Sequence, residues 1–145
     1  MAAVASGNPS AAELRDILFD TRTVAVVGAS NNPSRPSNDV FEYLLRHSRY
    51  ELYPVNPNIT EIDGIKVYPR LADLPVVPDM VDVFRRRDEL PRVLTEVLAL
   101  SPRPKYLWLQ QGLRHDQVAA AAREAGLTVV MDRCLKVDLH LIQDD

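Results

Sequence analysis

The feature that most constrains the fold is a regular alternation between short apolar runs and amphipathic segments. The runs are rich in Val, Leu, Tyr and Phe, which is typical of strands. The segments between them carry apolar residues at helical spacing. Strands that alternate with helices of this length predict right-handed crossovers and a parallel sheet. The expected strands are 23–27, 50–55, 80–84, 106–109 and 128–131, and the expected helices between them are 38–48, 88–100 and 116–126.

We therefore expect an α/β protein with a Rossmann-like, three-layer, doubly wound, five-stranded parallel sheet. Segment 56–79 interrupts the rhythm with four prolines and an Asp-Gly turn, so it should replace a full crossover helix and hold one helical turn at 71–74. The strand order predicted from this pattern is 3-2-1-4-5. In such sheets ligands bind at the carboxyl ends of the strands, beside the point where the order reverses.

Two helix starts and the N-terminal segment can also be predicted from the sequence. Ser10 and Glu13 form a capping-box pattern that predicts a helix over 11–19, and Asp116 is the expected cap of the helix at 116–126, which should end at Gly126. We treat residues 1–145 as one domain, with 1–9 flexible.

Composition narrows the class of partner. The chain is 46% apolar and 26% charged, with a net charge of −3, so it gives no reason to expect nucleic acid or a membrane as partner. Without a signal-peptide pattern or a long apolar run, we expect a cytoplasmic protein. Cys134 is the one cysteine, so we expect no disulfide framework and no metal site.

The loop after the first strand looks like a phosphate-binding loop with altered glycines. Gly28 is followed by Ser30 and Pro33 where the dinucleotide fingerprint has its other two glycines. Gly28 permits a close backbone approach, and Ser30, Asn31 and Asn32 offer polar groups just before a helix begins. This favours a phosphate site over a plain polar turn.

Three other strand ends would face the same ligand. An NAD site normally has an acidic residue after the second strand, but Asn56 stands there. Arg85, the first of three arginines after the third strand, and Arg35 from the first loop suit an anion. The fourth strand ends in Gln110, Gln111 and Gly112, which permit hydrogen bonds and close approach. Each of these strand ends also has a simpler interpretation. The second would be a strand that ends in a proline, the arginines after the third would be solvated surface charges, and the end of the fourth would be an ordinary glycine turn.

No catalytic residue is predicted. His47, His115 and His140 are scattered, and Asp79 and Asp82 show no acid–base motif. Cys134 would by default be an inert thiol.

Taken together, "VAVVGASNNPSRPS", "YPVNP", "KVYPRLADLP", "DMVDVFR", "LWLQQG" and "VVMDRCLK" resemble the CoA-binding domain family, over roughly residues 15–140. That family is related to the N-terminal domain of the succinyl-CoA synthetase alpha subunit. The resemblance implies coenzyme A as ligand. The residues that match its loops are Gly28, Ala29, Ser30, Asn31 and Asn32 around the phosphates, Pro57 and Asn58 near the nucleotide, Phe84 and Arg85, and Gln110, Gln111 and Gly112 along the pantetheine arm.

The synthetases also use a phosphorylated histidine in a second domain and an ATP-grasp partner, and His140 does not stand in a matching motif. We therefore expect non-catalytic binding of CoA or an acyl-CoA, a small-molecule ligand, by this chain alone. An NAD(P)-binding oxidoreductase-like protein and an interaction subunit that retains only the fold are the alternatives. If Cys134 faces the end of the pantetheine arm, oxidation would join it to CoA in a mixed disulfide.

Overall fold

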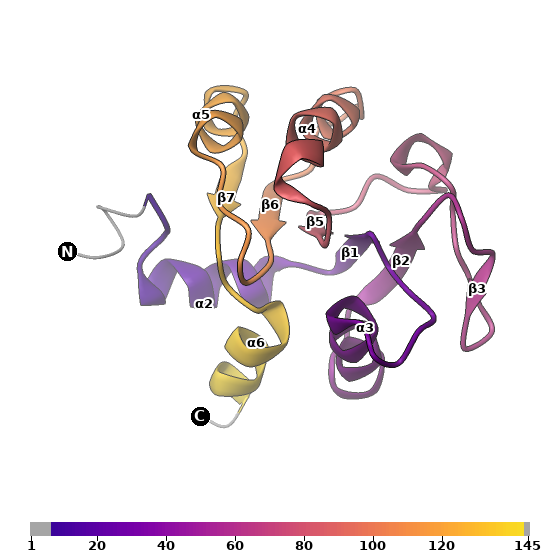
Figure 1. Ribbon diagram of the computed structural model, residues 1–145. Coiled ribbons are helices and arrows are strands. Elements are labelled where there is room, and N and C mark those ends of the chain that lie inside the picture. The colour runs from indigo at the N-terminus through magenta and orange to yellow at the C-terminus, as the bar shows by residue number, and fades with distance from the viewer. Residues whose placement is uncertain (1–6, 144–145) are drawn as a thin grey trace.

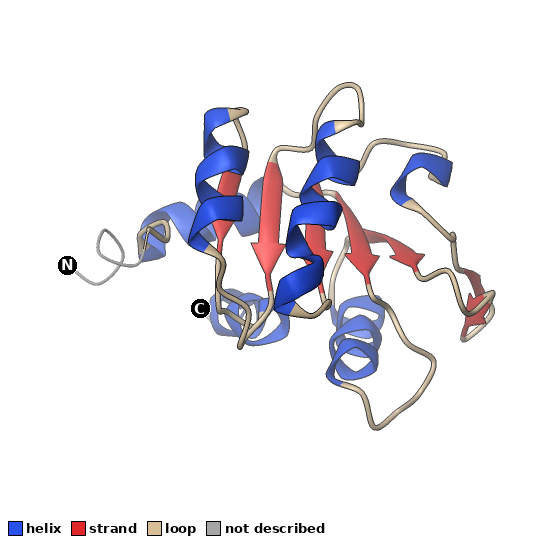
Figure 2. Ribbon diagram, turned by 45° about the horizontal axis from the view of Figure 1, so that its top comes forward, coloured by secondary structure: helices blue, strands red, loops and turns tan. Residues whose placement is uncertain are grey.

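The fold, seen in a computed structural model that describes residues 7–143, is a five-stranded parallel sheet covered by helices on both faces (Figure 1). All five strands run in the same direction (Figure 2). The strands of the sheet are β1 (Thr23–Val27), β2 (Glu51–Val55), β5 (Met80–Val83), β6 (Tyr106–Leu109) and β7 (Thr128–Val130). The predicted α/β class and the five predicted strands are confirmed.

The predicted strand order is wrong. The sheet runs β2-β1-β5-β6-β7, which is 2-1-3-4-5 in the numbering of the prediction. Pro54 gives a physical reason, because it lacks an N–H and a proline in a strand is tolerated at a sheet edge. The predicted order would have placed its strand inside the sheet, whereas the observed order leaves β2 at the edge and pairs β1 with β5.

Two helical layers sandwich the sheet. Helices α2 (Ala11–Asp20), α3 (Pro36–His47) and α6 (Leu135–Gln143) cover one face, and α4 (Leu90–Leu98) and α5 (Asp116–Glu124) cover the other. Side chains alternate between the two cores, so Val26 packs under α2, α3 and α6 while Val27 packs under α4 and α5. Helix α6 was not predicted from the sequence.

The irregular connection 56–79 behaves as expected. It forms a two-stranded hairpin, β3 (Glu61–Ile62) and β4 (Ile65–Lys66), around the Asp-Gly turn, where both turn residues have positive φ. One helical turn follows at η1 (Leu71–Asp73), and a second short turn, η2 (Arg87–Glu89), precedes α4.

Helix starts differ in how they are capped. The capping box of α2 is confirmed, since Ser10 Oγ accepts from the Glu13 N–H and Glu13 Oε1 accepts from the Ser10 N–H. The expected cap of α5 at Asp116 is wrong. His115 is the cap, and its Nδ1 accepts from the Val118 N–H at 3.1 Å. Asp116 is the first residue inside the helix.

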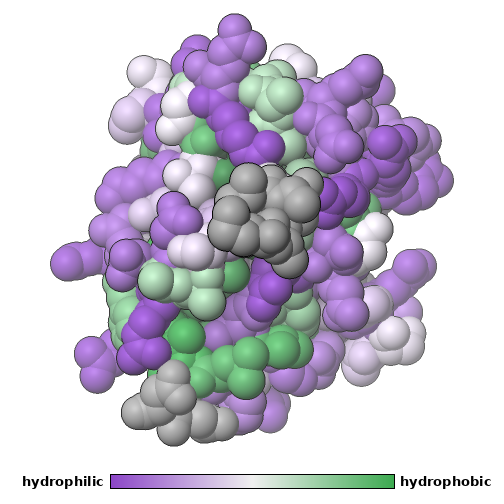
Figure 3. All heavy atoms as spheres, turned by 90° about the vertical axis from the view of Figure 1, so that its left-hand side faces the viewer, coloured by the Kyte–Doolittle hydropathy of each residue, from purple (hydrophilic) through white to green (hydrophobic). Residues whose placement is uncertain are grey.

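The expected flexible segment 1–9 falls mainly on residues 1–6, which lie outside the described residues. Asn8 exchanges two hydrogen bonds with the main chain of Met131, at 2.7 and 2.8 Å. One side of the molecule carries an apolar patch (Figure 3), and the helices on that side expose Phe19 of α2 and Val137 and Leu141 of α6. Within residues 7–143, none of the helices is long and apolar enough to cross a membrane.

Candidate functional site

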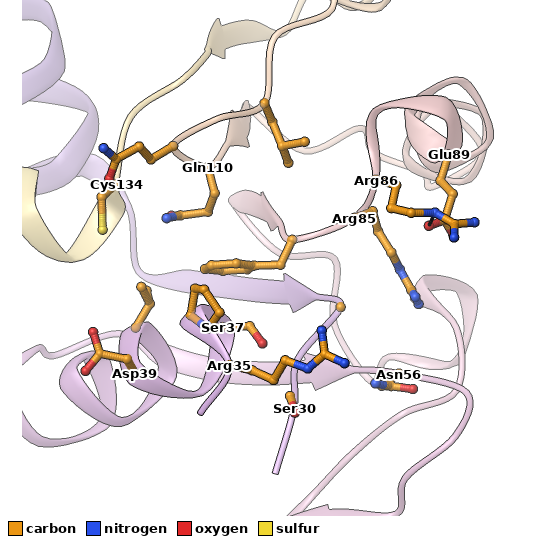
Figure 4. A pocket seen from close by; sticks show the side chains of 16 residues that line it. Ser30, Arg35, Ser37, Asp39, Asn56, Arg85, Arg86, Glu89, Gln110 and Cys134 are labelled. Atoms are coloured by element: carbon orange, nitrogen blue, oxygen red, sulfur yellow. Dashed lines mark ion pairs between the residues drawn. The ribbon is translucent and has the colours of Figure 1, made fainter. Parts of the chain in front are cut away.

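A cavity of about 750 Å³ opens at the carboxyl ends of the strands (Figure 4). Its size falls within the range of small-molecule pockets. It draws its walls from the residues after β2, β1, β5 and β6, from the start of α3, and from the residue before α6. The lining residues are Gly28, Ser30, Arg35, Pro36, Ser37, Asp39, Val40, Asn56, Phe84, Arg85, Arg86, Glu89, Gln110, Gln111, Leu113 and Cys134.

The cavity lies at the point where the strand order reverses. The chain leaves β1 toward α3 on one face of the sheet and leaves β5 toward α4 on the other. Such divergence opens a crevice between adjacent strand ends. Gly28 makes the turn at φ 85°, and its N–H donates to the Val55 carbonyl at 3.0 Å. The correction to the strand order therefore moves the crevice to β1 and β5.

The polar residues of the first loop mostly hold the loop itself. Asn32 Oδ1 accepts from the N–H and the hydroxyl of Ser34, and Ser30 Oγ accepts from the Asn32 N–H at 3.0 Å. Asn38 donates to the Ser30 carbonyl at 2.9 Å. Of the residues predicted here, Gly28 and Ser30 line the cavity, whereas Ala29 is buried and Asn31 and Asn32 are exposed outside the lining.

The start of α3 is open toward the cavity. Arg35 is the N-cap residue but gives no side-chain cap, and Pro36 begins the helix. Ser37 is only 5% exposed and lines the cavity, and among the described residues its hydroxyl has no hydrogen-bond partner. Because a helix N-terminus favours negative charge, this end of the cavity suits an anion. Sequence reasoning missed Ser37, although a serine in the first turn after an uncapped start is a signal that could have found it.

Asn56 joins two loops through both polar atoms of its side chain. Its Nδ2 donates to the Ala29 carbonyl at 2.7 Å, and its Oδ1 accepts from the Asn58 N–H at 2.8 Å. Asn56 lines the cavity, but Pro57 and Asn58 are exposed outside the lining. The end of β2 therefore presents an amide already committed to loop structure in place of the acidic residue of an NAD site.

Arginines make the same end of the cavity positive. Arg35 and Arg85 line it, and neither forms an ion pair within the described part of the chain. Arg86 also lines the cavity but lies 3.4 Å from Glu89. Arg87 lies outside the lining and donates to the Arg114 carbonyl at 2.8 Å. The charges free to meet an anion are therefore those of Arg35 and Arg85.

The other end of the cavity is formed after β6 and before α6. Gln110 is 5% exposed, and its Oε1 accepts from the Leu135 N–H at 3.1 Å. Figure 4 shows the half-buried Cys134 on the same side of the cavity as Gln110, and Gln111 also belongs to the lining. Gly112 lies outside the lining, and its N–H donates to Asp132 at 2.7 Å.

Ionisable groups in or near the cavity are mostly engaged. Asp39 lines it and pairs with Lys136 at 2.9 Å. Asp82, one residue before the end of β5, lies outside the lining and is fully buried, which raises its pKa well above the ordinary value. No histidine lines the cavity within residues 7–143, and no cluster of three or more potential metal ligands occurs there.

Comparison with known proteins identifies similar sequences and structures. A family model described as CoA binding domain matches residues 22–140. An uncharacterised Bacillus subtilis protein, YneT, is 41% identical over 130 residues, which is 90% of this chain and 94% of YneT. The alpha subunit of an ADP-forming acetate–CoA ligase from Pyrococcus furiosus is 31% identical over 81 residues, covering 56% of this chain and 18% of that subunit.

A solved structure of a Thermus thermophilus protein superposes on this chain with a TM-score of 0.85 at 41% identity. The match covers 92% of this chain and 99% of that one. The similarity therefore extends over nearly the whole fold.

Proposed function

The chain belongs to the CoA-binding domain family, and we propose that it binds coenzyme A or an acyl-CoA in the cavity at the strand ends without catalysing a reaction by itself. The resemblance seen in the sequence is thereby confirmed at the level of the family. The ligand, the contacting residues and the absence of catalysis are the proposal.

The observation that carries the proposal is the unequal character of the two cavity ends. One end holds the unpaired Arg35 and Arg85 beside the uncapped start of α3. The other holds Gln110, and Val40 and Phe84 add apolar surface to the lining. Coenzyme A has the matching polarity, because its phosphates lie at one end and an amide-containing arm of low charge extends from them.

An NAD-dependent enzyme fits these residues less well. Asn56 stands where the acidic residue should hold the ribose hydroxyls, and its side chain bonds Ala29 of the first loop and Asn58 of its own loop. NADP is the stronger competitor, since arginines accept its additional phosphate. An interaction subunit that keeps only the fold would have no use for unpaired arginines at an open helix start.

The residues that line the cavity are better suited to binding a ligand than to catalysing a reaction on it. Its two carboxylates are paired, Asp39 with Lys136 and Glu89 with Arg86. A general base must lie within hydrogen-bond reach of the proton that it removes, and each of these carboxylates instead contacts a cation. The Pyrococcus furiosus relative is named a ligase, but only 18% of it is matched, so we propose for this chain the binding step alone.

Titration calorimetry with CoA, acetyl-CoA, NAD and NADP tests the proposal directly. We expect binding of CoA or acetyl-CoA at least tenfold tighter than that of NADP, and no detectable heat with NAD. Tighter binding of NADP than of CoA would overturn the proposal. No detectable heat with any of the four ligands would support the alternative that the chain is an interaction subunit that retains only the fold.

Ser30→Glu tests the location of the phosphates. A carboxylate at this lining position should repel them and abolish CoA binding, while the exposed loop should let the fold persist. Thermal unfolding without ligand checks the fold. Unchanged CoA affinity in a folded variant would show that the phosphates lie elsewhere.

A further inference from the structure

The cavity follows the sheet order from one side of the molecule to the other. Asn56 follows β2, Ser30 follows β1, Phe84 follows β5 and Gln110 follows β6, and all four line the cavity. Cys134, in the segment between β7 and α6, also lines the cavity, and it lies beside the end of β6, because the Arg133 N–H donates to the Leu109 carbonyl. Strands in a sheet are about 4.8 Å apart, so the three steps from β2 to β6 span roughly 14 Å. An elongated ligand held by its phosphates near β1 would therefore point its far end toward Cys134.

The surroundings of Cys134 place its sulfur at this far end. Gln110 accepts from the N–H of Leu135, the residue peptide-bonded to Cys134, so the Gln110 side chain and Cys134 are neighbours. The Cys134 carbonyl accepts from the Asp138 N–H at 3.0 Å, which fixes this residue at the start of α6. Figure 4 shows Cys134 and Gln110 at the cavity end opposite Arg85 and Asn56.

Two polar side chains that line the cavity keep hydrogen-bonding capacity that the protein itself does not use. Ser37 is 5% exposed and lines the cavity, and its hydroxyl has no hydrogen-bond partner among the described residues. Gln110 is equally buried, and within residues 7–143 its amide NH2 donates to no protein atom. Neither group is among the fully buried unpartnered atoms of residues 7–143, so both are open to the cavity, where a ligand can supply a partner to each. One of these groups lies at the anion-binding end and the other beside Cys134.

We propose that Cys134 is a thiol–disulfide exchange site that retains the ligand covalently when the ligand is oxidised. The inference rests on the proposed function, because it requires a ligand whose arm ends in a thiol. The oxidant is the disulfide form of coenzyme A. The Cys134 thiolate attacks one sulfur of that disulfide, a new S–S bond joins Cys134 to CoA, and the old S–S bond breaks. The second CoA leaves as a thiolate with the electron pair and takes up a proton, while the Cys134 proton goes to solvent.

This site would differ from an ordinary reactive cysteine because the cavity binds the nucleotide part of the disulfide before the thiol reacts. The nucleotide end would be held by Arg35 and Arg85, so exchange should be fast for CoA disulfide and slow for a disulfide without a nucleotide. Glutathione disulfide is a suitable comparison, because it offers the same S–S chemistry and lacks the phosphates. The sequence contains one cysteine, so any adduct on the intact chain lies on Cys134.

Intact-mass measurement of the full chain, incubated with CoA disulfide in the absence of reductant, tests the proposal. We expect a mass increase of one CoA per chain that dithiothreitol reverses, at a rate at least tenfold above that for glutathione disulfide. Cys134→Ser should show no adduct, and its thermal unfolding checks that the variant is folded. Arg35→Ala should slow the reaction with CoA disulfide more than the reaction with glutathione disulfide, and Arg92→Ala, an exposed position of α4 outside the cavity, should leave both rates unchanged.

Calorimetry of the wild-type chain with reduced CoA, in the presence of reductant, separates this inference from the proposed function. Binding of reduced CoA without adduct formation from CoA disulfide would overturn the inference and leave the proposed function standing. Equal rates with the two disulfides would overturn it as well, by showing an unguided thiol. Failure to bind reduced CoA would overturn the proposed function, and the guided exchange with it.

Discussion

Gly28 and Phe84 approach so closely that a Cβ atom on Gly28 would lie 2.0 Å from the Phe84 carbonyl oxygen. The two residues directly follow the adjacent strands β1 and β5, and the Phe84 N–H donates to the Val27 carbonyl at 2.8 Å. The contact is between two backbones, so no rotamer change can relieve it. Gly28 is therefore required by the fold before it serves any ligand.

Gly28→Ala should destabilise the protein strongly. The substitution costs about 1–2 kcal/mol for a side chain at positive φ, and overpacking against fixed backbone adds roughly 1–3 kcal/mol. Gly64→Ala is the matched control, because Gly64 has φ 80° and nothing within 4 Å of its added Cβ. Urea denaturation of the two variants measures the difference, and equal losses of free energy of unfolding would contradict the close approach.

Arg35→Ala and Arg85→Ala should each weaken CoA binding without unfolding the chain. Hydrogen bonds to charged groups contribute about 1.5–3 kcal/mol, which corresponds to a roughly 10- to 150-fold loss of affinity. Arg92→Ala is the control, since Arg92 is an exposed arginine of α4 outside the cavity. Calorimetry should also show that binding depends less on salt in the cavity variants. An Arg92→Ala effect as large as theirs would indicate general charge attraction in place of a site.

Periodicity predicted the elements well, because most of them bury one regular apolar face. Leu90, Val93, Leu94 and Val97 form such a stripe on α4, and all four are buried. Helix α6 escaped prediction because its pattern is mixed. Val137 and Leu141 are exposed, whereas Asp138 is buried.

Long-range pairing was harder to predict than element type. Strand β1 pairs with β2 on one side, and which strand pairs with it on the other side depends on the path of the connection 56–79. No local sequence pattern encodes that path. Pro54 was the available signal, since it marks an edge strand. The fold class and the types of the elements could thus be predicted from local residues. The strand order could be predicted only from a residue such as Pro54, which is disfavoured inside a sheet.

The candidate site shows a similar division. Residues beside strand ends, such as Ser30, Arg85 and Gln110, were predicted and line the cavity. Asn31 and Asn32 were also predicted but lie outside the lining, because polarity alone cannot tell a ligand contact from a bond that shapes the loop. Ser37 and Asp39 were missed because their place in the wall depends on how α3 docks against the sheet.

His115→Ala should weaken the start of α5. The Nδ1 atom of His115 accepts from the Val118 N–H, and loss of a side-chain cap costs about 1 kcal/mol. His115→Asn should recover part of that loss, because asparagine is a favoured N-cap residue. Chemical denaturation of the two variants gives the comparison. If alanine and asparagine were equally destabilising, lost packing of the 9% exposed ring would be the main effect.

Asp82 is a carboxyl group in the apolar interior of the sheet. It lies in register between Val26 and Trp108, is 0% exposed, and neither of its oxygens has a hydrogen-bond partner among residues 7–143. The indole N–H of Trp108 is already donated to the Arg133 carbonyl at 2.8 Å. Burial therefore raises the pKa of Asp82 well above 3.8, its ordinary value.

Asp82→Asn should flatten the dependence of stability on pH. Above pH 3.8 the unfolded chain releases the Asp82 proton while the folded chain keeps it, so rising pH favours unfolding. The wild type should lose about 1.4 kcal/mol per pH unit relative to the variant, until the pH reaches the folded pKa. Below pH 3.8 this difference should stop changing. Because other carboxyl groups are common to both proteins, subtracting their unfolding free energies from pH 3 to 8 isolates Asp82, and a constant difference would show that Asp82 is ionised in the folded state.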